Sequence, residues 1–258
     1  MTTSLYNTYM KRLTILLLTA LMGVLGCMAQ QDRRVQYKPY IDLRPMHFGI
    51  LIGAHLQDLE FENVGMQTIT DGNGNVTNQL IVCDADRWSP GFSVGVLGEL
   101  RLHDNFSLRI APTMHFGAKH LTFLDLQNTD AVGKPLKETQ DLKNTYFSLP
   151  IDIKFSAPRW NNHRPYVIAG INPMINMTSG DQDIIRLKRF STMAEVGLGC
   201  DFYLPFFKLI PELKFCFGLS NVLDKNHVNE LRDENLKAYA GCVSSAQSKM
   251  IVLTFYFE

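Results

Sequence analysis

Apolar and polar residues alternate along most of eight apolar-rich segments of the chain. In residues 91–102, Phe92, Val94 and Val96 fall on one face of an extended strand, while Ser93 and Glu99 fall on the other. A period of two indicates a β-strand whose two faces meet different surroundings. The eight segments are residues 46–55, 91–102, 106–117, 146–155, 166–177, 190–203, 207–219 and 249–258.

The connections between these segments alternate in length and begin and end with a long one. The three short connections are residues 103–105, 157–163 and 204–205. Outer-membrane barrels combine an even number of antiparallel strands with short periplasmic turns and longer outside loops. The pattern therefore predicts an all-β fold over residues 46–258. This fold is an eight-stranded antiparallel transmembrane β-barrel with four long outside loops and three short periplasmic turns.

Two orientations of the strands fit the alternation. The apolar face can look outward to lipid with the charges inside, or inward as in a soluble lipocalin-like barrel. Aromatic residues at both ends of many apolar faces, and the segregation of long and short loops, favour lipid. Glycines on the charged face, such as Gly95 and Gly197, suit a crowded interior. We expect the outer membrane as the location and its lipid as a partner.

Charged residues share the polar face of the predicted strands, and their signs balance. Eight strands enclose an interior that side chains can just fill, and buried charges need partners. We therefore expect a paired charge network that plugs the lumen. A small ion or proton pathway is the alternative. The acidic members are Glu99, Asp152, Glu195, Asp201 and Glu212, and the basic members are Arg101, Arg109, Lys154, Lys208 and Lys214.

The N-terminus has the pattern of a signal peptide over residues 1–29. A positive pair, Lys11 and Arg12, precedes an apolar run over residues 13–24. Cleavage after Ala29 follows the small-residue rule, and acylation of Cys27 in a lipoprotein-like box is the alternative. Residues 30–45 are then expected to form a periplasmic lead-in to the barrel.

Four cysteines remain after the predicted cleavage site. Cys83 and Cys242 fall late in two long loops that share one end of the barrel, so an interloop disulfide is expected in this oxidising location. Four free thiols are the alternative. Cys200 and Cys216 fall on opposite faces of their strands and are not expected to pair.

The composition and motifs argue against several other functions. Net charge is zero, so no basic surface points to nucleic acid. The seven histidines are scattered without a metal-ligand spacing. No G-x-S-x-G motif marks a nucleophile. We expect no catalytic residues, no cofactor and no metal.

Parts of the chain resemble the PorT family, which are eight-stranded outer-membrane barrels of the type IX secretion system of Bacteroidetes. The similar stretches are residues 149–155, 161–170, 195–203 and 206–213, together with the last strand. The resemblance implies a role in the assembly or translocation of exported proteins such as surface proteases and adhesins. Other secretion-system proteins would be its partners.

The last strand resembles the terminal assembly signal of outer-membrane proteins in general. Phe255 and Phe257 would form that signal, although the chain ends in Glu258 and not in an aromatic residue. Two other functions remain open from the sequence. One is a surface adhesin or ligand-binding outer-membrane barrel, and the other is a soluble periplasmic lipocalin-like carrier.

Overall fold

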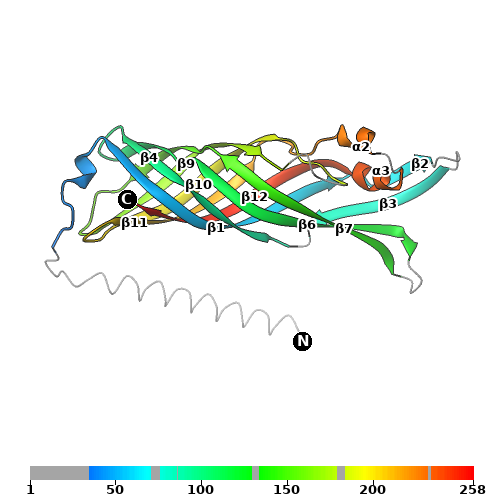
Figure 1. Cartoon of the computed structure of the whole chain (residues 1–258), viewed down its shortest axis with the longest axis horizontal. Helices are drawn as coiled ribbons and strands as arrows, with labels where there is room; N and C mark the ends of the chain where they lie inside the picture. Colours follow the sequence, from blue (N-terminus) through cyan, green and yellow to red (C-terminus); the bar gives the residue numbers. More distant parts are fainter. Residues whose placement is uncertain (1–34, 71–75, 86, 130–133, 179–183, 232–233) are drawn as a thin grey trace, which may run out of the picture. The chain divides into compact units, whose positions relative to one another are not determined.

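The computed structural model describes residues 35–70, 76–85, 87–129, 134–178, 184–231 and 234–258 (Figure 1). The chain divides into two units, Met1–Gln36 and Tyr37–Glu258. The predicted signal peptide, Cys27 included, lies outside the described residues. Among the described residues, no helix has the length and apolar character needed to cross a membrane.

The described residues form twelve strands, one 3-10 helix and two short α-helices. The strand count exceeds the expected eight for two reasons. Two predicted strands are each divided next to a proline, Pro112 and Pro150, which has no N–H for the ladder. The first long loop also contains a hairpin of two further strands. The elements are η2 (Ile41–Leu43), β1 (Met46–Asn63), β2 (Met66–Thr70), β3 (Val76–Ala85), β4 (Ser89–Arg101), β5 (Phe106–Ile110), β6 (Thr113–Thr129), β7 (Pro135–Ser148), β8 (Ile151–Ser156), β9 (His163–Asn176), β10 (Phe190–Tyr203), β11 (Lys208–Gly218), α2 (His227–Glu230), α3 (Glu234–Gly241) and β12 (Val243–Phe257).

The strand pairings return to their starting point. β1 pairs with β4 on one side and with β12 on the other, so that Ile50 lies opposite both Val96 and Phe257. The ring runs from β4 through β5 and β6, β7 and β8, β9, β10 and β11 to β12, and every pairing is antiparallel. We call its two ends the short-turn end (residues 102–105, 157–162 and 204–207) and the long-loop end.

The outer face of the ring is apolar over a belt next to the short-turn end. In β1 this belt covers residues 46–56, which matches the ~9–11 residues that a tilted strand needs to cross a bilayer. Phenylalanines pair at both borders of the belt. The rings of Phe92 and Phe116 lie 4.9 Å apart, and those of Phe106 and Phe155 lie 5.0 Å apart. Exposed aliphatic residues of the belt include Ile50, Ile52, Val94, Val96, Ile153, Val167, Ile171, Val196, Leu198 and Leu253.

Beyond the belt, the apolar face of the strands changes sides. In β1 the outward residues change from Leu56 to Glu60, which pairs with Lys249, while the inward Leu59 is only 1% exposed. β6 shows the same change, because His120 points outward and Phe123 is fully buried inside the ring. The strands therefore continue past the belt with a charged outside and an apolar inside.

An apolar cluster fills the ring at the long-loop end. Segments predicted as loops contribute to it, because β3 pairs with β6, and α3 lies beside β3. Three of the four connections predicted as long loops therefore contain regular structure: β2 and β3 in the first, the extensions of β6 and β7 in the second, and α2 and α3 in the fourth. The members of this apolar cap are Leu59, Ile81, Cys83, Leu121, Phe123, Leu142, Ile184, Ile185, Leu187, Val222, Leu223, Ala238, Ala240, Cys242, Val243 and Ala246.

The belt predicts where a charge is tolerated on the outer face. Val96→Arg places a charge in the middle of the belt and should lower the free energy of unfolding in lipid vesicles by about 2–4 kcal/mol. Thr139→Arg, on the exposed part of β7 beyond the belt, should change it by less than about 0.5 kcal/mol. Urea titrations measure both values. Equal losses would contradict the assignment of the belt.

Candidate functional site

Arg109 on β5 lies at the centre of the ring and is completely buried. Its Nη2 donates to Oε2 of Glu99 at 2.8 Å, and its Nη1 donates to Oε2 of Glu212 at 2.5 Å. The hydroxyls of Tyr166 and Tyr256 also donate to Glu212, at 2.5 and 2.8 Å. The guanidinium lies about 5 Å from the centres of both tyrosine rings, a distance typical of cation–π contact. Arg109 therefore joins strands from opposite parts of the ring.

The ion pairs continue from this centre toward the short-turn end. Nζ of Lys154 lies 3.4 Å from Glu99 and 3.0 Å from Asp201. Nζ of Lys208 lies 3.2 Å from Asp201 and 3.0 Å from Glu258. Glu258 in turn contacts His47 at 2.5 Å. Cations and carboxylates thus alternate along the interior, so most of these buried charges lie between opposite charges.

The network also continues toward the long-loop end through Lys214. Its Nζ lies 2.8 Å from Glu195, 3.3 Å from Asp152 and 3.6 Å from Glu212. Two glycines leave room for these side chains. A Cβ on Gly170 would lie 2.2 Å from Oδ1 of Asp152, and one on Gly197 would lie 2.7 Å from Cγ of Lys214.

Nine of the ten predicted network charges meet in this interior. Arg101 does not join them, because it lies at the short-turn rim, where it pairs with the exposed Asp104 and donates to the carbonyl of Leu43. The sequence reasoning missed Tyr166, Tyr256 and Glu258. The two tyrosines point inward from β9 and β12, but strand parity does not indicate that their hydroxyls join an ion-pair network.

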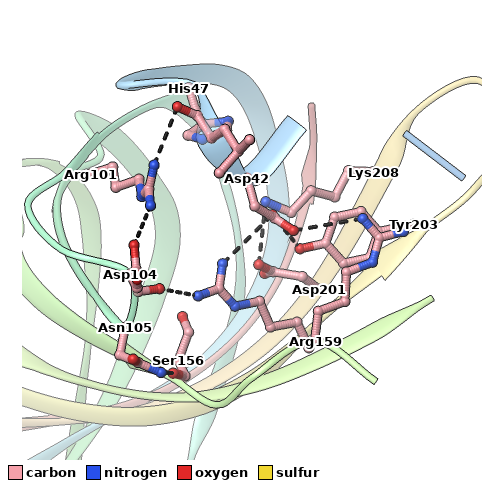
Figure 2. A network of polar contacts seen from close by, with 12 residues as sticks. Asp42, His47, Arg101, Asp104, Asn105, Ser156, Arg159, Asp201, Tyr203 and Lys208 are labelled. Atoms are coloured by element: carbon pink, nitrogen blue, oxygen red, sulfur yellow. Dashed lines mark hydrogen bonds and ion pairs between the residues drawn. The ribbon is translucent and has the colours of Figure 1, made fainter. Parts of the chain in front are cut away.

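The lead-in segment is held against the short-turn end, as Figure 2 shows. The hydroxyl of Tyr203 donates to Asp42 at 2.5 Å, and Arg159 and Arg164 each lie 3.6 Å from that carboxylate. Arg159 also donates to the carbonyl of Lys38 at 3.2 Å. Residues 37–45 are therefore part of the folded unit and not merely a tether.

The arrangement gives the interior little free space at membrane depth. A cavity of about 20 Å³ beside Glu195 and Lys214 has room for about one water molecule. In the described part of the chain, no group of three or more His, Cys, Asp and Glu residues is arranged to hold a metal ion. The described charged side chains of the interior thus mainly bind one another.

Cys83 and Cys242 lie in the same buried apolar cap. Their expected position in loops needs correction for Cys83, which lies in β3, whereas Cys242 directly precedes β12. Both are thiols in the structure. Burial raises the pKa of Cys242 to about 12, so its thiol is protonated at neutral pH and slow to oxidise in the folded protein. Cys216 is buried beside Glu195, whereas Cys200 is partly exposed.

The C-terminal residues occupy both faces of β12. Phe255 is 36% exposed on the belt, and the ring of Phe257 lies 6.0 Å from that of Phe207. Glu258 turns inward to His47 and Lys208. A role of Phe255 and Phe257 in assembly stays a prediction.

Comparison with protein families identifies this fold. A family model described as an outer membrane protein beta-barrel domain matches residues 28–224, more than half of the chain. The chain belongs to this outer-membrane β-barrel family. Its location is the outer membrane, and the lipocalin-like soluble carrier is therefore ruled out, in agreement with the outward apolar face.

Solved structures of outer-membrane proteins are similar to this barrel protein at low sequence identity. OprG from Pseudomonas aeruginosa is 11% identical with a TM-score of 0.41, covering 81% of this chain and 91% of its own. Neisserial surface protein A is 12% identical with a TM-score of 0.39, covering 83% and 98%. Ail of Yersinia pestis, bound to the heparin analogue sucrose octasulfate, is 13% identical with a TM-score of 0.34, covering 83% and 99%. No curated protein matches the sequence.

The network predicts a contrast between its centre and its rim. Glu212→Gln leaves Arg109 buried with one carboxylate fewer and should lower the free energy of unfolding by about 3–5 kcal/mol. Arg101→Gln removes only a rim pair and should cost about 1 kcal/mol or less. Urea unfolding of both variants in detergent micelles measures the difference. A similar loss in both would show that the central ion pairs are not what stabilises the barrel.

Cys83 and Cys242 are both thiols within one buried cluster, so the bridge between them stays a prediction. Protein isolated from the outer membrane and digested without reductant should release a Cys83–Cys242 cross-linked peptide. Unfolding in excess alkylating reagent is the control, because the buried thiols react only as they become exposed, and this blocks exchange during digestion. Recovery of both residues as alkylated thiols would exclude the bridge, and a Cys200–Cys216 peptide would contradict the strand parity.

Proposed function

We propose that the protein is a non-conducting outer-membrane barrel that supports type IX secretion as an assembly or translocation component. The secretion role rests on the resemblance to the PorT family in residues 149–155 and 161–170. The observation that defines the role is the filled interior, in which Arg109 and Lys154 are each less than 2% exposed. A plugged ring leaves no path for an exported protein, so its contribution is as an accessory to other secretion-system proteins. The proposal includes no catalytic step.

The short-turn end is the proposed contact surface for periplasmic partners. The docked lead-in presents Tyr40, which is 76% exposed, and Leu43, which is 62% exposed. Lys38 and Arg44 flank them around a cavity of about 260 Å³. Exposed aromatic residues beside basic residues are frequent in protein interfaces. The contacts of Asp42 hold this segment in a defined position, which lowers the entropy lost on binding.

A second candidate function is a ligand-binding surface module, and one observation favours it. A cavity of about 400 Å³ opens at the long-loop end between Ile185, Leu223 and Val243, with Arg186 and Asp224 among its polar residues. Nε and Nη2 of Arg186 donate to Asp224 at 3.0 and 2.9 Å. Although partial burial opposes it, this hydrogen bonding holds the pKa of Asp224 below its usual range. The cavity wall therefore keeps a fixed ion pair.

Deletion of the gene tests the secretion role. Loss of type IX cargo from the medium and its retention in the periplasm is the expected result, and the wild-type gene should restore export. The paired substitution Tyr40→Ala with Leu43→Ala should also impair export at normal barrel abundance. Leu126→Ala, at a 48% exposed site of the long-loop end, is the control. Normal export in the deletion strain would favour the ligand-binding alternative.

Conductance measurements test the plug separately. Purified barrel in planar bilayers should show no steady channel current, because the ion pairs fill the interior at membrane depth. A denatured and refolded sample is the control for insertion artefacts. Sustained large conductance would overturn the accessory role, since the barrel could then form a conduit itself.

A further inference from the structure

Lys119 on β6 is a buried cation outside the ion-pair network. Its side chain points into the ring and is only 2% exposed. Nζ lies 3.4 Å from the hydroxyl of Tyr146 and 3.4 Å from Oγ of Ser248. Within the described ranges no carboxylate comes close enough to form an ion pair with it. The acid with the strongest electrostatic effect on it, Asp58, lies on the outward face of β1 and accepts the backbone N–H of Leu59.

Amide groups on neighbouring strands are also left without partners at this level. Neither side-chain polar atom of Asn144 has a hydrogen-bond partner in the described protein, and neither has Nδ2 of Asn176. Both residues are 2% exposed. The strand register brings them together with Lys119, because Asn144 pairs with Gly117, and Asn176 pairs with Tyr146. Leaving such a buried donor unsatisfied costs about 1–3 kcal/mol.

The level of Lys119 is bounded on both sides. Toward the long-loop end, the next inward residue of β6 is Leu121 of the apolar cap, and Leu142 of the cap pairs directly with Lys119. Toward the short-turn end lies His115, whose Nε2 contacts Ser148 at 3.0 Å and whose Nδ1 contacts Ser93 at 2.7 Å. The polar groups around Lys119 therefore lie between the cap and the ion-pair network, beside a buried cluster that includes Tyr146, Met174 and Met250.

We propose that Lys119 is the centre of a binding site for a small monovalent anion of halide size. The ligand would accept hydrogen bonds from Nζ of Lys119, from Nδ2 of Asn144 and of Asn176, and from the hydroxyls of Tyr146 and Ser248. One negative charge neutralises the one buried cation, whereas a divalent oxyanion would leave an unpaired charge in the interior. The site goes beyond the proposed secretion role and does not depend on it.

A bound halide stabilises the folded barrel by mass action. We expect the urea midpoint of the wild type to rise along a series in which chloride replaces gluconate at constant ionic strength. The rise should vanish in Lys119→Met. Lys143→Met, which removes an exposed lysine of the next strand, should keep the wild-type chloride dependence.

Crystals of the wild-type barrel soaked in bromide locate the ligand directly. We expect an anomalous peak within hydrogen-bonding distance of Nζ of Lys119. No peak there would overturn the proposal, as would a Lys119→Met variant that keeps the full chloride dependence. If Lys119→Met does not fold, the bromide measurement on the wild type decides alone.

Discussion

The outer face of the long strands meets lipid along one part and water along the other. The rest of the structure depends on this constraint. Lipid cannot solvate a charge, so the outward residues of the belt, such as Ile52 and Val96, are apolar. Where the outer surface meets water, outward residues such as Glu60 are charged, and the apolar residues turn inside. A strand has only two faces, so a change in the residues that face outward also changes the residues that face the interior. At membrane depth the ion pairs share the interior with buried apolar residues such as Leu51, Leu97 and Ile168, and beyond the belt the interior is mainly apolar.

The interior at membrane depth is stable because its charges are paired within a narrow ring. Arg109 is held by two glutamates and flanked by two tyrosine rings, so its desolvation is offset by four contacts from different strands. Large side chains approach the backbone closely at inward glycines, and this makes the packing around Arg109 possible. At Gly199 a Cβ would lie 2.4 Å from the hydroxyl of Tyr166, so a side chain there would displace that tyrosine from Arg109 and Glu212. The small inward residues are thus as much a part of the network as the charged ones.

Strand parity made most of the belt and network predictable, and its limits explain what was missed. Glu99 and Lys154 carry charge on the face opposite an apolar face, which identifies them as inward. Arg101 has the same parity, but it is the last residue of β4 and lies at the rim. Parity does not show how far along the ring axis a residue lies. Leu121 and Phe123 share the inward face of Lys119, and parity alone does not show that they belong to an apolar cap beyond the belt. The docking of Asp42 depends on Arg159 and Arg164 from another turn, a contact that no local pattern encodes.

The two parts of the ring are stabilised by different forces. The hydrophobic effect needs water as the alternative surroundings, so it does little for outward residues that stay in lipid. Hydrogen bonds and ion pairs must therefore stabilise the belt. At the long-loop end the outside is water, and burial of Leu59, Phe123 and Ile185 contributes as in a soluble protein. Segments that would be mobile loops on an open barrel are thereby held by an apolar core. The cap thus gives the long-loop end a defined surface. At membrane depth, ion pairs between strands occupy the interior of the ring.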